Sequence, residues 1–133
     1  MKILHVEEEE PVFRAVKRML SIMGHTSDNI PNMASLPQDL SPWDLIITDG
    51  QFPGGNGLQV AELALKQLKT CIIYSGCSEL KAAVEARGFI FVDKAEPETL
   101  KKVIEGIAAV RITDRPLSFG VSAVGAYPSG KQG

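Results

Sequence analysis

Five polar side chains in this 133-residue chain directly follow short apolar runs, where a strand would end: Glu7, Glu8, Asp49, Ser75 and Lys94. In an open α/β sheet the carboxyl ends of parallel strands meet at one edge, which brings such residues together. Three carboxylates in one cleft repel each other unless a cation is present, and a hard divalent ion such as Mg²⁺ prefers oxygen ligands. A lysine and a hydroxyl would complete a site suited to the charge of a phosphoryl group.

The elements that would position these residues alternate along the chain. Apolar, β-branched runs predict buried strands, and apolar residues at helical spacing predict helices. The segment 31–42 contains three prolines, which leave room for at most a short or distorted helix around 33–40. Ser78 is expected to cap one helix, and Pro97 to open the last. The expected strands are 2–6, 25–30, 45–48, 71–74 and 89–92, and the expected helices are 11–23, 58–69, 78–87 and one from 97 onward.

This alternation predicts one fold class. Short connections and right-handed crossovers favour a doubly wound α/β fold. We therefore expect a five-stranded parallel sheet of flavodoxin-like strand order 2-1-3-4-5, with helices on both faces.

Composition excludes several classes of protein. An apolar content of 44% and a formal net charge of -2 describe a globular domain with no general electrostatic reason to bind nucleic acid. No apolar run has the length of a membrane span, so a cytoplasmic location is expected. Cys71 and Cys77 are expected to be free thiols, and with His5 and His25 they lack the spacing of a zinc site. His5 is expected to be a satisfied residue of the first strand.

Four sequence blocks together resemble the receiver domain of two-component response regulators, and in particular chemotaxis-type regulators. The blocks are VEEEEPVFRAV at 6–16, DLIITDGQFPGGNG at 44–57, YSG at 74–76 and FVDK at 91–94. The resemblance implies a phosphoacceptor signalling domain rather than an enzyme, one that assists its own phosphoryl transfer and dephosphorylation. We expect the receiver domain to span 1–112, followed by a flexible or loosely docked tail at 113–133.

The resemblance also implies roles for individual residues. Asp49 would be the phosphoacceptor, attacking phosphorus as a carboxylate nucleophile. Lys94 would pair with the phosphoryl oxygens, and Ser75 would hydrogen-bond to them. Phe91 occupies the position of the aromatic switch residue, which would couple the site, together with Ser75, to the face formed by the last helix, strand and helix.

A magnesium ion is implied as the cofactor, held by Glu7, Glu8, Asp49 and the backbone carbonyl of Gln51. Three residues depart from the family pattern. Glu8 replaces the usual Asp, and its extra methylene moves the carboxylate by about a bond length, which Mg²⁺ tolerates poorly. Ala95 replaces a proline that is usually preceded by a cis peptide bond, and Gly50 replaces an apolar side chain, which would loosen the loop.

The implied partners are a sensor histidine kinase or a histidine phosphotransfer protein, and a downstream protein target. Neither direct nucleic-acid binding nor membrane binding is expected, and a homodimer is left open. Two alternatives also remain open. One is a pseudo-receiver that binds its partner without phosphorylation, and the other is a flavodoxin-like protein that binds flavin or another small molecule. The lack of a glycine-rich phosphate loop counts against the second.

Overall fold

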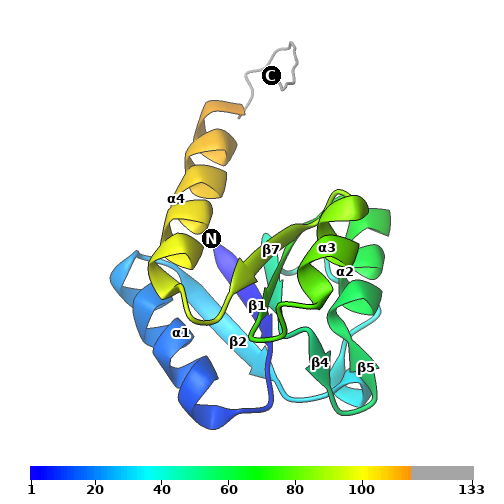
Figure 1. Cartoon of the computed structure of the whole chain (residues 1–133). Coiled ribbons are helices and arrows are strands. Elements are labelled where there is room, and N and C mark those ends of the chain that lie inside the picture. The colour runs from blue at the N-terminus through cyan, green and yellow to red at the C-terminus, as the bar shows by residue number, and fades with distance from the viewer. Residues whose placement is uncertain (115–133) are drawn as a thin grey trace. The chain divides into compact units, whose positions relative to one another are not determined.

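Five parallel strands form one sheet, in the order β2-β1-β3-β6-β7, in the computed structural model (Figure 1). With β6 and β7 as the fourth and fifth of these strands, this is the predicted 2-1-3-4-5 order. The structure describes residues 1–114. The strands of this sheet are β1 (Lys2–Val6), β2 (Thr26–Ile30), β3 (Leu45–Thr48), β6 (Thr70–Ser75) and β7 (Ile90–Asp93), and the helices are α1 (Glu10–Ile22), α2 (Gly57–Lys66), α3 (Leu80–Ala86) and α4 (Pro97–Asp114).

Helices cover both faces of the sheet, as predicted. Helix α1 lies on one face, while α2 and α3 lie on the other (Figure 1). Strands β3 and β6 are buried along most of their length because they lie inside the sheet between these layers. Their apolar runs thus reflect burial on both faces. One hydrophobic core lies on the face of α2 and α3; its buried residues include Leu4, Val6, Ile46, Val60, Ile73 and Val84.

The proline-rich segment between β2 and β3 contains no α-helix. It forms only a short 3₁₀ helix, Met33–Ser35, which agrees with the prediction. Leu36 and Leu40 from this segment are nevertheless buried in the core. The side-chain amide of Gln67 fixes the segment, because its oxygen accepts a hydrogen bond from the Leu40 N–H (2.7 Å) and its nitrogen donates one to the Gln38 carbonyl (2.7 Å). The core is therefore closed here by an irregular segment.

Two local features differ from the sequence-based expectation. The glycine-rich loop after Asp49 forms a small hairpin of strands β4 (Gln51–Phe52) and β5 (Gly55–Asn56), which was not predicted. The predicted cap at Ser78 is wrong, because α3 begins at Leu80 and no side chain caps it. Pro97 does open the last helix, as expected.

The chain divides into two compact units. The first is Met1–Leu100, and the second begins at Lys101, within α4. All the site residues discussed below belong to the first unit. The predicted tail at 113–133 lies almost entirely outside the described residues, so the predicted boundary at residue 112 stays a prediction. Within residues 1–114, no helix combines the length and the apolar character needed to span a membrane.

Candidate functional site

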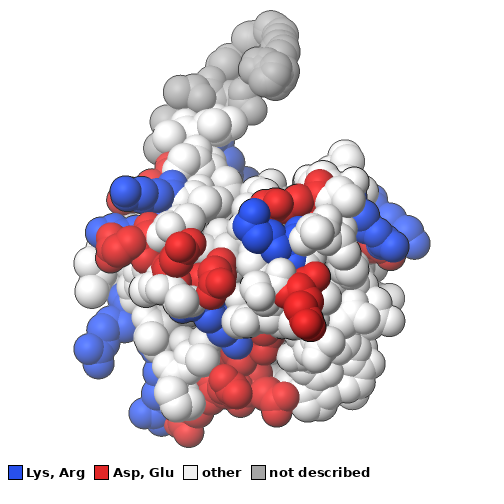
Figure 2. Space-filling model, viewed as in Figure 1, with Lys and Arg blue, Asp and Glu red and all other residues white. Residues whose placement is uncertain are grey.

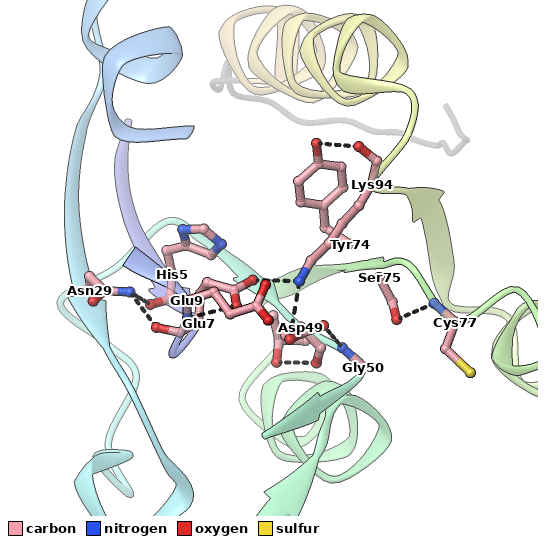
Figure 3. A network of polar contacts seen from close by, with 11 residues as sticks. His5, Glu7, Glu9, Asn29, Asp49, Gly50, Tyr74, Ser75, Cys77 and Lys94 are labelled. Atoms are coloured by element: carbon pink, nitrogen blue, oxygen red, sulfur yellow. Dashed lines mark hydrogen bonds and ion pairs between the residues drawn. The ribbon is translucent and has the colours of Figure 1, made fainter. Parts of the chain in front are cut away.

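The Lys94 ammonium group lies between two carboxylates at the carboxyl edge of the sheet. Its Nζ atom is 2.9 Å from Oε1 of Glu7 and 3.2 Å from Oδ2 of Asp49 (Figure 3). The three residues follow β1, β3 and β7, so the sheet brings them together from distant parts of the sequence. The backbone N–H of Lys94 donates a hydrogen bond to the Ser75 carbonyl at 3.1 Å, which anchors the lysine beside β6. Four of the predicted site residues thus lie at one edge.

Glu7 is the most deeply buried member of this cluster, with none of its surface exposed. Its Oε2 atom accepts a hydrogen bond from the Glu9 N–H at 3.1 Å. Its Oε1 atom forms the ion pair with Lys94 but makes no well-oriented hydrogen bond within the described part of the chain. Burial raises the pKa of the Glu7 carboxyl, and the attraction of Lys94 offsets this only in part. The backbone on either side of Val6 is fixed by Asn29, whose side chain donates hydrogen bonds to the carbonyls of His5 and Glu7.

The ion pairs also determine the charge of the lysine. Burial disfavours the charged form of Lys94, but its contacts with Glu7 and Asp49 outweigh that effect. The pKa of Lys94 is therefore raised, and its ammonium group remains charged at neutral pH.

Asp49 is held firmly by its backbone while its carboxylate stays accessible. Its N–H donates to the Val6 carbonyl at 2.9 Å, and its carbonyl accepts a hydrogen bond from Oγ1 of Thr48 at 2.9 Å. Its Oδ1 atom accepts a hydrogen bond from the Gly50 N–H at 2.7 Å. The side chain is 13% exposed, against 0% for Glu7. Of the two acids that contact Lys94, only Asp49 is therefore open to a reactant from solvent.

Ser75 is the last residue of β6, the strand beside β3, and its side chain lies next to Gly50. Its hydroxyl oxygen accepts a hydrogen bond from the Cys77 N–H at 3.1 Å, and the residue is buried. A Cβ atom on Gly50 would lie 2.5 Å from Oγ of Ser75 and 2.6 Å from Cδ1 of Leu80. The loop is therefore not loosened by the glycine, because Ser75 and Leu80 occupy the space that a side chain would need.

Replacing Gly50 by alanine should test this packing. Because the two closest atoms are ends of side chains that can rotate, and Cβ of Ser75 lies further away at 3.0 Å, we expect Gly50→Ala to lower the free energy of unfolding by only about 1 kcal/mol. Urea denaturation measures this change. Gly76→Ala is the matched control, because a Cβ atom there has no neighbour within 4 Å and stability should be unchanged. Equal stability of the two variants would contradict the proposed crowding.

The remaining predicted site residues, Glu8, Gln51 and Phe91, lie outside the cluster of Glu7, Asp49 and Lys94. Glu8 is exposed and forms no ion pair with Lys94 within residues 1–114. Gln51 opens strand β4 two residues after Asp49, and its side chain is exposed. Phe91 is half-buried and packs against the core on the face of α2 and α3. The roles of these three residues stay predictions.

The described residues contain no group of three acid, histidine or cysteine side chains able to hold a metal ion. Mg²⁺ nevertheless often binds through one or two carboxylates, with water and substrate oxygens completing its shell. Glu7 and Asp49 supply two such carboxylates, and Oε1 of Glu7 is a buried oxygen that contacts Lys94 and accepts no well-oriented hydrogen bond within residues 1–114. This donor set fits a magnesium ion held by two of the three predicted side chains, and the parts of Glu8 and the Gln51 carbonyl stay predictions.

Two aromatic residues near the cluster were not predicted as part of it. His5 is 2% exposed, and its Nε2 atom has no hydrogen-bond partner in the described part of the chain, so the expectation of a satisfied histidine is wrong. Burial, with the nearby Lys94 charge, lowers the pKa of His5 to about 3 and keeps the ring neutral. The Tyr74 hydroxyl donates to the Lys94 carbonyl at 3.3 Å (Figure 3). The only sign of these two neighbours in the sequence was a histidine inside an apolar strand.

Comparisons with known proteins identify the fold. A receiver domain protein from Clostridium thermocellum matches with a TM-score of 0.69 and 20% identity, over 84% of this chain and 97% of that one. The response regulator TrrA from Thermotoga maritima, in complex with Mg²⁺ and BeF, matches with a TM-score of 0.64 and 23% identity, over 78% of this chain and 96% of that one. The signal receiver domain of a putative Luxo repressor protein from Vibrio parahaemolyticus matches with a TM-score of 0.70 and 18% identity, over 85% of this chain and 94% of that one.

No family model and no curated protein matches the sequence. The structural matches nevertheless agree with the strand order, and this chain has the fold of response-regulator receiver domains. The fold expected from the resemblance is therefore confirmed, while the roles of individual residues remain to be tested.

Proposed function

We propose that this chain is a receiver module of two-component signalling in the cytoplasm, which accepts a phosphoryl group on Asp49 from a phosphohistidine in a kinase or phosphotransfer protein. One observation carries the proposal. The partly exposed Asp49 carboxylate lies 3.2 Å from the Lys94 ammonium group, at the sheet edge where Ser75 also lies. A nucleophile, a fixed cation and a hydroxyl donor are the groups that phosphoryl transfer needs.

In the proposed step an Asp49 carboxylate oxygen attacks phosphorus, and the phosphorus–nitrogen bond of the donor imidazole breaks. Lys94 balances the charge on the phosphoryl oxygens, and Glu7 holds the lysine in position. The Ser75 hydroxyl, which now accepts a hydrogen bond from Cys77, would turn to donate one to the phosphoryl group. Glu7 and Asp49, with Glu8 and the Gln51 carbonyl as further candidates, would hold Mg²⁺, which would neutralise charge developing on the phosphoryl oxygens.

Output would be contact with a downstream protein. Movement of Ser75 toward the phosphoryl group would leave space in which Phe91 could turn further inward. Phe91 is already half-buried against the core, so a modest rotation would change the surface beside β7. The TrrA structure, whose complex contains Mg²⁺ and BeF, supports the proposed use of Mg²⁺ at the level of the fold.

Intact-mass spectrometry after incubation with acetyl phosphate tests the proposal. We expect one phosphoryl adduct that requires Mg²⁺, is lost in Asp49→Asn, and persists in the matched variant Asp39→Asn at an exposed aspartate. Asparagine keeps the shape of the side chain but is not a carboxylate nucleophile. An adduct that survives in Asp49→Asn would place the phosphoacceptor elsewhere.

A phosphorylation-independent interaction module is the second candidate. It is favoured by the position of Lys94, which already balances two carboxylates, and by the exposure of Glu8 outside the cluster. In that case no adduct would form at any Mg²⁺ concentration. Binding of the partner would then be equal for the wild type and Asp49→Asn, which pull-down from a lysate can measure.

A further inference from the structure

A cavity of about 470 Å³ lies beside the acceptor cluster, between α1 and the residues that open α4. All of its lining residues belong to the unit Met1–Leu100. Its walls are mainly apolar, formed by Val12, Val16, Met19 and Leu100 among others. Pockets of about 300–1,000 Å³ with apolar walls and a few polar groups are typical of small-molecule sites. The cavity therefore has the size and the lining of a binding site for an organic molecule.

The polar lining of this cavity includes one residue of the acceptor cluster, Lys94. Tyr74 and Lys94 line the cavity, and so does Glu98. The Tyr74 hydroxyl can accept a hydrogen bond, since it acts as the donor in its bond to the Lys94 carbonyl. The carboxylate of Glu98 forms no ion pair or hydrogen bond with any residue in the described part of the chain. Two groups are thus available to receive hydrogen bonds from a ligand.

A buried histidine lies on the same face of the sheet. His5 pairs with Ile47 and Ile47 with Ile72, so His5 and Tyr74 project from one face because side chains alternate along a strand. Figure 3 shows both rings on the same side of the Lys94 ammonium group. His5 itself does not line the cavity, and its Nε2 atom has no hydrogen-bond partner within residues 1–114.

Charge selects among the ligands that would fit. Lys94 is the one cation that lines the cavity, and its ammonium group is already paired with Glu7 and Asp49. The lining carries one carboxylate, Glu98, and one ammonium group, Lys94, whose charge is balanced by Glu7 and Asp49, so the charge of Glu98 is left without a counter-charge in the lining. Negative charge remains in excess even if the buried Glu7 is protonated. The neighbouring turn between β1 and α1 adds further exposed acids, and Figure 2 shows acidic side chains gathered there. An anionic ligand would be repelled and a cationic one attracted.

We propose that this cavity binds a small hydrophobic amine, whose apolar body lies between α1 and the start of α4 and whose ammonium group contacts Glu98 and the Tyr74 hydroxyl. The proposal does not depend on phosphorylation of Asp49. Because Lys94 belongs both to the wall of the cavity and to the acceptor cluster, an occupied cavity would also hold the lysine against Glu7 and Asp49. Such a ligand would therefore act directly on the acceptor cluster.

Three probes with the same indole body test the choice of ligand: tryptamine, which is cationic, tryptophol, which is neutral, and indole-3-acetate, which is anionic. Titrations of the full ¹⁵N-labelled chain, followed by amide chemical shifts, give each dissociation constant. We expect tryptamine to bind about tenfold more tightly than tryptophol, a difference of about 1.4 kcal/mol, and indole-3-acetate to bind most weakly. The shifts should concentrate at 11–19 and 94–100.

Three variants decide whether the cavity is the site. Ala15 lines the cavity from an exposed position, so Ala15→Trp should fill it without unfolding the protein and abolish binding. Ala83→Trp, the same change at an exposed position of α3 on the opposite face, should bind normally. Glu98→Gln should lower the affinity for tryptamine severalfold and leave that for tryptophol unchanged. Equal affinities for the three probes, binding of none, or normal binding by Ala15→Trp would overturn the proposal.

Discussion

Replacing Lys94 by methionine should lower the free energy of unfolding by about 3 kcal/mol, because it removes the partner of a fully buried carboxylate. Methionine keeps the apolar stem of lysine, so the loss measures the missing charge rather than the missing volume. Glu7 would remain inside the sheet edge beside the like charge of Asp49. Urea denaturation at neutral pH measures the loss.

The same variant should also acquire a characteristic pH dependence. Burial raises the pKa of Glu7, and removal of Lys94 takes away the main influence that lowers it. The folded state then binds a proton that the unfolded state has released, so stability decreases as the pH rises above the unfolded value of about 4.3. Lys94→Met should therefore be closest to wild type near pH 4–5 and lose most stability above the raised pKa.

Two further variants make this prediction specific. Glu7→Gln combined with Lys94→Met removes the buried charge and should recover most of the lost stability and flatten the pH dependence. Lys81→Met breaks an exposed pair with Glu85, whose side chains are 58% and 50% exposed, and should cost well under about 1 kcal/mol. If Lys94→Met behaves like Lys81→Met, the buried pair does not stabilise the fold.

The fold could be predicted from the sequence because its three central strands, β1, β3 and β6, are buried on both faces along most of their length. Runs such as Leu45 to Thr48 are apolar without alternation, and this is the pattern of central parallel strands. The hairpin β4–β5 was not predictable in the same way, because two-residue strands have no periodicity. The beginning of α3 was also misplaced: Ser78 is a good capping residue by type, yet the turn after Ser75 leaves it outside the helix.

The site was predictable as far as backbone topology determines it. The residues after β1, β3, β6 and β7 meet because the strands are parallel, and this placed Glu7, Asp49, Ser75 and Lys94 correctly. Side-chain direction depends on packing that the sequence does not display. Glu7 and Glu8 are the same residue type in adjacent positions, yet Glu7 is fully buried and Glu8 is exposed. The cavity beside Lys94 was missed for the same reason.

Gly57, the first residue of α2, should be the position where one methyl group disturbs the acceptor most. A Cβ atom there would lie 2.7 Å from the carbonyl oxygen of Asp49 and 3.3 Å from Cα of Gly50. These are backbone atoms held in place, since the Gly57 N–H donates to the Gly50 carbonyl at 2.8 Å and the Asp49 N–H donates to the Val6 carbonyl. Rotation of a side chain cannot relieve the clash, in contrast to the one expected at Gly50.

We therefore expect Gly57→Ala to lower the free energy of unfolding by about 2–3 kcal/mol, more than Gly50→Ala. Urea denaturation compares the two variants. The backbone of Asp49 must move to admit the methyl group, so its amide chemical shift should change and the phosphoryl adduct should form more slowly. Gly106→Ala is the control with the opposite sign: its Cβ atom meets nothing within 4 Å, and alanine should stabilise a helix interior by about 0.5–1 kcal/mol. A stable Gly57→Ala variant with an unchanged Asp49 amide would show that the helix start can retreat from the acceptor, and that the close contact between α2 and Asp49 is not required to position the carboxylate.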